Sequence, residues 1–214
     1  MTPIKLQLAI FIDQPLMRPE KIGDNINDFM QDLFNTTPVI TPIPFETPFE
    51  MAVVQMRSMD SIHELNISKN RIDYFVNESA DIFKLYESNA KKIMNCLSRL
   101  QIGTTRLGFV FNYFIEDKNA IKTIATRYLK EPERLEEIGL RYNKPIKMSG
   151  YTLNNIIQIN NSEKLVADKK PILGILINHD INTVPATKNI PHSKFESLLQ
   201  NVVSNEINLT LEAL

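Results

Sequence analysis

The sequence is poor in several residue types that carry common protein chemistry. Its 214 residues include one cysteine, Cys96, three histidines, six glycines and no tryptophan. A single cysteine cannot form an intramolecular disulfide, which excludes a disulfide-stapled secreted fold. No Cys-x-x-Cys or His-x-x-x-His spacing occurs, so a zinc site has no ligand set. The two glycines of residues 103–108 lack the Lys-Ser/Thr ending of a phosphate loop, and we expect neither a metal nor a cofactor.

Long apolar runs are missing too. The longest, such as residues 172–177, are far shorter than the ~20 residues that a membrane-spanning helix needs. Residues 1–12 alternate between polar and apolar side chains instead of forming a basic region and a continuous apolar run, so no signal peptide is readable. We therefore expect a soluble, cytoplasmic protein that does not contact a membrane.

Neither sign of charge is in excess. The chain has 24 Lys and Arg residues against 25 Asp and Glu residues, with 10 against 13 in residues 1–102 and 14 against 12 in residues 103–214. A protein that binds nucleic acid normally carries a basic surface, because it must neutralise phosphates. The balance of charges makes nucleic acid an unfavoured partner.

Hydrophobic periodicity is the clearest signal that the sequence does contain. In the first half, apolar side chains alternate with polar ones in four stretches, which predict strands at residues 5–12, 51–57, 63–68 and 71–77. Helical spacing predicts helices at residues 19–34 and 80–101. Between the first helix and the second strand, residues 36–50 hold four prolines and predict an extended connection.

The second half follows a similar order of elements. The patterns predict a strand at 107–115, a helix at 117–128, strands at 147–160 and 172–184, and a final helix at 193–214. A short additional helix is expected around residues 135–140. Aromatic residues alternate along the strand at 107–115, and we expect them to be buried or to form a protein interface rather than a platform for stacking bases.

Together these patterns predict an α+β protein with a mainly antiparallel sheet and helices packed on one face. The order strand, helix, strands, helix occurs twice, in residues 1–102 and 103–214, which suggests a tandem duplication. Residue identity between the halves is slight, so a common α+β arrangement without duplication explains the order equally well. The halves could hold one sheet each, or share one continuous sheet and form one domain.

No catalytic motif is readable, and the sequence leans against an enzyme without excluding one. Polar side chains on otherwise apolar strands are the candidates for ligand binding. They are Arg57, His63, Arg71, Tyr74, Arg106, Tyr151 and His179. The dipeptide His179-Asp180 is similar to the metal-binding pair of the HD phosphohydrolases, but consecutive strand residues point to opposite faces and no further ligands stand nearby.

The leading functional hypothesis is a protein–protein interaction, with the chain as a homo-oligomer or as a subunit of a complex. The proline-rich residues 36–48 could offer an extended arm to a partner, or cover the sheet as an ordered loop. The first alternative is a small-ligand binder or enzyme built from the scattered strand residues. The second is an RNA-binding protein with tandem ferredoxin-like halves, an architecture that resembles CRISPR RNA-processing proteins. Those proteins usually carry a glycine-rich loop near the C-terminus and a basic surface, which this sequence lacks.

Overall fold

The computed structural model describes residues 1–42, 48–129, 135–165, 170–185 and 188–212. Within these residues the chain forms ten strands and four helices. The strands are β1 (Thr2–Ile12), β2 (Val39–Ile40), β3 (Val54–Arg57), β4 (His63–Ile67), β5 (Arg71–Asn77), β6 (Thr104–Glu116), β7 (Gly139–Asn143), β8 (Ile146–Met148), β9 (Tyr151–Lys164) and β10 (Ile172–Thr183). The helices are α1 (Pro19–Phe29), α2 (Ile82–Arg99), α3 (Ala120–Tyr128) and α4 (His192–Glu212).

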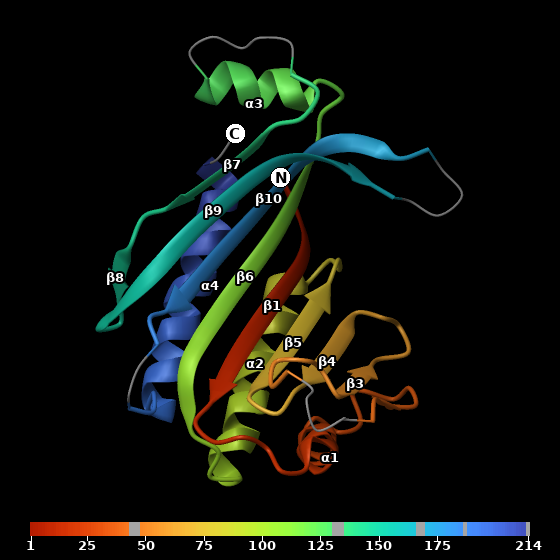
Figure 1. Cartoon of the computed structure of the whole chain (residues 1–214), viewed down its shortest axis with the longest axis vertical. Helices are drawn as coiled ribbons and strands as arrows, with labels where there is room; N and C mark the ends of the chain where they lie inside the picture. Colours follow the sequence, from red (N-terminus) through yellow and green to blue (C-terminus); the bar gives the residue numbers. More distant parts are fainter. Residues whose placement is uncertain (43–47, 130–134, 166–169, 186–187, 213–214) are drawn as a thin grey trace.

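All ten strands belong to one antiparallel sheet (Figure 1). The order across the sheet is β2-β3-β4-β5-β1-β6-β10-β9-β7, and β8 pairs with β9. The pairing of β1 with β6 joins the first half of the chain to the second, so the sheet is continuous. The predicted α+β class with a mainly antiparallel sheet is confirmed.

The helices lie on one face of the sheet. Because side chains alternate along a strand, one face takes the apolar residues. Leu8 and Ile10 of β1 are fully buried there, beside Phe109 and Leu107 of β6. Figure 1 shows α2 and α4 behind the central strands, and α1 packs against β3 and β4. The other face carries no helix in the described part of the chain, and we call it the helix-free face.

The apolar core has two parts, both under helices. The larger part lies under α1, α2 and α4 and draws on both halves of the chain. The aromatic residues of β6 belong to it, and Phe109 and Phe111 are fully buried, as expected. The smaller part lies under α3 and consists of Ala120, Ile124, Ala125, Ile138, Ile159 and Ile175.

The two halves share one strand order. In the first half the order is β3-β4-β5-β1, and in the second half it is β7-β9-β10-β6. Each half also begins with its innermost strand followed by a helix, and ends with a helix. This order agrees with the repeated unit expected from the sequence; a duplication of that unit stays a prediction.

Two expected elements differ from the structure. The short helix expected around residues 135–140 is wrong, because residues 139–143 form β7 and pair with β9. The single long strand expected at 147–160 is two strands, β8 and β9, joined at Ser149 and Gly150. Both residues have positive φ angles, 51° and 83°, which suits the tight turn of a hairpin.

Part of the proline-rich arm, residues 43–47, lies outside the described residues. No helix in the described part of the chain is both long and apolar enough to cross a membrane.

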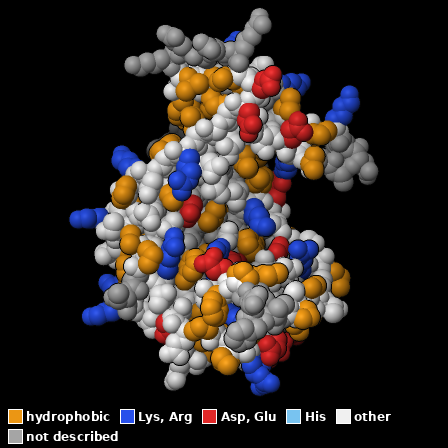
Figure 2. Space-filling view, in the orientation of Figure 1, with side chains coloured by type: hydrophobic (Ala, Val, Ile, Leu, Met, Phe, Trp, Pro, Cys, Tyr) orange, Lys and Arg blue, Asp and Glu red, His pale blue; other side chains and the backbone are white. Residues whose placement is uncertain are grey.

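The sheet is strongly coiled, so the helix-free face is concave. Nζ of Lys164, at the end of β9, lies 2.5 Å from Oε2 of Glu78, which follows β5. Three strands separate β5 from β9 in the sheet. In a flat sheet they would lie roughly 19 Å apart, because neighbouring strands are spaced by about 4.8 Å. Figure 2 shows the resulting hollow beside the hairpin of β9 and β10.

Candidate functional site

An aromatic ring lies between two arginines on the helix-free face, near the ends of three neighbouring central strands. Phe11 is on β1, and its partners on the neighbouring strands are Arg71 on β5 and Arg106 on β6. The guanidinium carbon of each arginine lies 5.0 Å from the centroid of the Phe11 ring. Each contact is a cation–π pair, which contributes about 0.5–1 kcal/mol at an exposed site. The sheet order therefore assembles this Arg71–Phe11–Arg106 stack from three separate segments.

Carboxamide side chains on the same face join neighbouring strands. The hydrogen bonds that do so run from Gln7 to Asp73, from Asn178 to Asn112, and from Arg106 and Asn154 to Asn182, at 2.8–3.0 Å. These bonds hold the side chains in place before any molecule binds. A surface fixed in this way loses less conformational entropy on binding than a loose one.

Acidic and basic side chains are mixed on the helix-free face. The basic residues on its strands are Lys5, Arg57, Arg71, Arg106, Arg141, Lys147 and Lys164, and the acidic residues are Glu64, Asp73, Glu116 and Asp180. Arg71 Nη2 lies 2.8 Å from Asp73 Oδ1, and Arg57 Nη2 lies 3.8 Å from Glu64 Oε1. Figure 2 shows basic and acidic side chains scattered among uncharged ones over this face. Basic residues are the more numerous, but acidic side chains lie beside them at several points of the face.

The seven residues predicted from the sequence divide between the two faces. Arg57, Arg71 and Arg106 lie on the helix-free face, where Arg71 and Arg106 meet at Phe11 and Arg57 lies apart on β3. His63, Tyr74, Tyr151 and His179 lie on the face that the helices cover. His63 and Tyr74 are in contact, whereas Tyr151 packs against the larger core. The seven residues therefore do not form one site.

His63 and Tyr74 form a buried cluster under α2. Nδ1 of His63 lies 2.9 Å from the hydroxyl of Tyr74, which also accepts a hydrogen bond from Asn89 of α2 at 2.9 Å. Burial lowers the pKa of His63, and the negative charge of Asp60 opposes this effect only in part. Burial also raises the pKa of Tyr74, which keeps its hydroxyl protonated. The cluster ties α2 to β4 and β5 with uncharged groups.

The lowered pKa of His63 predicts a loss of stability in mild acid. The folded chain favours the neutral imidazole, so this stability is present above the unfolded pKa of about 6.5 and is lost as the pH falls through that value. Replacing His63 by glutamine, which does not titrate, should reduce the loss by up to about 1.4 kcal/mol per pH unit. Urea unfolding of the wild type and of His63→Gln, from about pH 7.5 to about pH 5.5, measures how much unfolding free energy each protein loses. Parallel stability curves would contradict the prediction.

His179 belongs to a second buried cluster, under α4. Its Nδ1 lies 2.6 Å from Oε1 of Glu206, and its Nε2 contacts Oδ1 of Asn155. Tyr113 donates a hydrogen bond of 2.6 Å to the other oxygen of Glu206. Burial and the nearby carboxylate raise the pKa of Tyr113, so its hydroxyl remains a donor. Asp180, the other half of the predicted pair, lies on the helix-free face, so the two side chains do not share a site.

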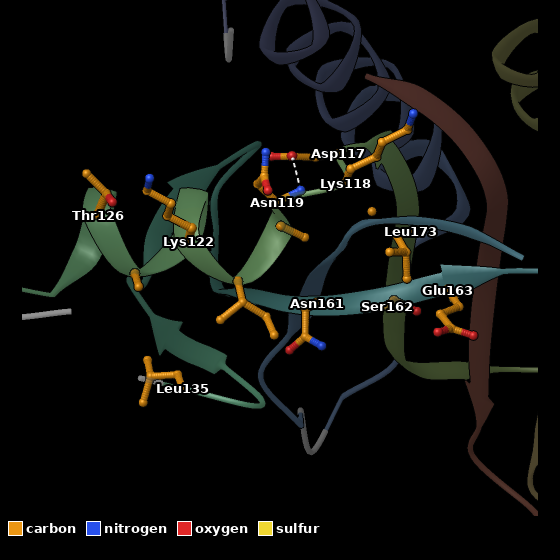
Figure 3. A pocket seen from close by; sticks show the side chains of 14 residues that line it. Asp117, Lys118, Asn119, Lys122, Thr126, Leu135, Asn161, Ser162, Glu163 and Leu173 are labelled. Atoms are coloured by element: carbon orange, nitrogen blue, oxygen red, sulfur yellow. Dashed lines mark hydrogen bonds between the residues drawn. The ribbon is translucent and has the colours of Figure 1, made fainter. Parts of the chain in front are cut away.

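A third feature is a pocket of about 740 Å³ between α3 and the far ends of β9 and β10 (Figure 3). Asp117 and Asn119 stand at the start of α3, and Asn161 and Ser162 come from β9. The carboxylate of Asp117 accepts hydrogen bonds from the backbone N–H of Asn119 and the hydroxyl of Thr123. It therefore serves the first turn of the helix, and the other charged residues that line the pocket are Lys118, Lys122 and Glu163.

No protein-family model matches this chain, and no curated protein matches it. The two candidate sites, the stack on the helix-free face and the cluster around His179, therefore rest on their geometry and chemistry.

Sequence patterns missed two residues that are central to these sites. Phe11 is an aromatic residue at an outward position of the alternating strand 5–12, where polar side chains are expected. Glu206 is 1% exposed and lies among the buried apolar residues of α4, such as Val202 and Val203. The sequence holds one clue to each residue. Phe11 is apolar at a position where the alternation predicts a polar residue, and Glu206 is acidic among residues that are apolar.

Proposed function

We propose that this chain binds a protein partner across the helix-free face of its sheet. The observation that carries the proposal is the Arg71–Phe11–Arg106 stack, which lies half-buried on that face near the ends of three central strands. Arginine and aromatic residues are enriched among the side chains that contribute most of the binding energy in protein interfaces. Amides on the same face would supply the polar contacts of the surrounding rim.

The mixed charge of the face favours protein over nucleic acid as the occupant. Asp73 lies beside Arg71, and Asp180 lies near Arg106 through Asn182. A phosphate backbone that crossed the face would meet these carboxylates as well as the arginines. A protein surface can match both signs of charge, and interspersed charges also exclude wrong partners.

The proposal is tested by site-specific photo-crosslinking in the native host. A photoreactive phenylalanine analogue at Val110, half-buried on the helix-free face of β6, should give a discrete crosslinked product. The same analogue at Ser88, exposed on α2, should not give that product. A product of twice the mass of the chain would identify the partner as a second copy. No product from Val110, or the same product from both positions, would contradict the proposal.

Binding of the purified partner then tests the stack itself. Arg106→Ala should weaken binding about fivefold or more, because an arginine that contributes substantially to an interface costs over about 1 kcal/mol when truncated. The matched control is Arg99→Ala, since Arg99 makes a similar contact with Phe29 at 4.8 Å on the helical side. Its affinity should equal that of the wild type. Salt-sensitive binding of single-stranded RNA or DNA, lost in Arg106→Ala alone, would instead assign the face to nucleic acid.

A further inference from the structure

A small pocket adjoins the cluster around His179, on the opposite side of the sheet from the helix-free face. It has a volume of about 290 Å³ and lies between β8, β9, β10 and α4. Its lining residues are Ile146, Met148, Asn155, His179, Ile181, Asn205 and Asn208. The volume is close to the lower end of the range for small-molecule sites, roughly 300–1,000 Å³. The pocket can therefore hold a small organic molecule.

Behind the pocket wall stands a buried acid, Glu206, in contact with His179. Glu206 is 1% exposed and His179 is 5% exposed, and their side chains meet at 2.6 Å. A buried ion pair contributes little to stability, because apolar residues of similar volume are often as stable or more so. The pair does, however, fix the orientation of the imidazole. Glu206 contacts Nδ1 of His179, and Tyr113 donates a hydrogen bond that keeps the Glu206 carboxylate in place. An orienting carboxylate behind an imidazole is typical of binding sites.

The chemistry of the pocket lining defines what could bind. None of its seven residues is Lys, Arg, Asp or Glu, and any charge on His179 is matched by Glu206. A charged ligand would lose its hydration without gaining a counter-charge, which is costly. Two exposed carboxamides, on Asn205 and Asn208, each present a donor and an acceptor side by side, whereas Oδ1 of Asn155 contacts Nε2 of His179. Ile146, Met148 and Ile181 offer an apolar wall.

We propose that this pocket binds a small uncharged nitrogen heterocycle of the nucleobase kind. The edge of such a base carries an adjacent donor and acceptor, which a carboxamide can pair with both at once. Its flat ring face is apolar enough to lie on the wall of Ile146, Met148 and Ile181. Both ring nitrogens of His179 are already engaged, by Glu206 and Asn155, so His179 lines the pocket without offering a hydrogen bond to the ligand. This site is independent of the protein interface proposed for the other face.

The test is a titration of the full chain with adenine and with cytosine, followed by NMR of the histidine side chains. Signals of the His179 imidazole should shift as one of the bases is added at millimolar concentration. Signals of His63, buried under α2, should stay in place and serve as an internal reference. If neither base shifts the His179 signals, the proposal is overturned.

Two variants test whether the amides recognise the base. Asn205→Ala with Asn208→Ala removes two exposed amides of α4, and alanine favours the helix, so the fold is retained. The dissociation constant should rise at least tenfold, because each lost hydrogen bond is worth about 1 kcal/mol. Gln200→Ala, an exposed amide of α4 outside the pocket, should leave it unchanged. Equal dissociation constants for the wild type and the double variant would overturn the proposal.

Two further probes test the chemical class. AMP carries the adenine ring with a charged phosphate, and phenol is an aromatic ring without the adjacent donor and acceptor. Both should bind more weakly than adenine. Tighter binding of AMP would show recognition of phosphate, and binding of phenol as tight as that of the bases would show an unspecific apolar site. Either result would overturn the assignment to an uncharged nucleobase.

Discussion

Replacing His179 by leucine is expected to lower the free energy of unfolding by about 3–5 kcal/mol. The imidazole contacts Oε1 of Glu206, and the contact between them lies in the interior. Without it, Glu206 keeps only the hydrogen bond from Tyr113 and becomes a buried acid that has lost the partner of its other oxygen. Chemical unfolding in urea, monitored by circular dichroism, measures the change.

The two partners of this pair should respond differently to removal. Glu206→Leu leaves the hydroxyl of Tyr113 and Nδ1 of His179 without an acceptor, which costs about 1–3 kcal/mol, while Nε2 of His179 keeps its contact with Asn155. The double variant His179→Leu with Glu206→Leu should be more stable than His179→Leu alone, since two apolar side chains replace the pair. Ser204→Ala, exposed on α4, serves as the control and should change stability little. Additive losses in the double variant would contradict a coupled pair.

Much of the fold follows from periodicity that is visible in the sequence. Alternation over residues 71–77 matches β5 residue for residue, and the apolar stripe of residues 80–101 matches α2. Both signals are local, because each residue's face depends only on its position in its own element. Residues 135–140 were wrongly expected to be helical for the same reason. Pairing of β7 with β9 decides their structure, and a local pattern carries no information on such a partner.

The candidate sites depend on neighbours that are distant in the chain. Alternation alone implies that Arg71 and Tyr74 face opposite sides of β5, since they are three residues apart. It cannot show that Arg71 and Arg106 both meet Phe11, because that requires the order β5-β1-β6. The contact between His179 and Glu206 likewise requires α4 to lie across β10. Residue types were therefore readable from the sequence, whereas their grouping was not.

Gly174→Ala is expected to lower the free energy of unfolding by about 2–3 kcal/mol through overpacking. Gly174 lies on β10 opposite Glu116 of β6, and the ring of Phe114 passes close to it. A Cβ atom at this position would overlap the carbonyl oxygen of Ile115 and the Phe114 ring. Thermal and urea unfolding of the purified variant measure the loss.

Gly108 on β6 provides a matched control, because it lies on the same helix-free face and in the same sheet. A Cβ atom there would meet Ala9 Cβ at 3.4 Å, an ordinary contact. Gly108→Ala should therefore be neutral or stabilise the chain by about 0.5–1 kcal/mol, as alanine does when it replaces a glycine inside a strand. Similar losses for the two glycine variants would contradict the packing described for Gly174.

A second substitution shows which of the two overlaps at position 174, with the Phe114 ring or with the Ile115 carbonyl oxygen, causes the loss of stability. If the Phe114 ring were the main obstacle, Phe114→Leu would restore part of the stability that Gly174→Ala removes. We expect no such recovery, because the carbonyl oxygen of Ile115 belongs to the backbone and cannot move away without disturbing the pairing of β6 with β10. Glycine at position 174 is therefore required by the close approach of two backbones rather than by the size of one side chain.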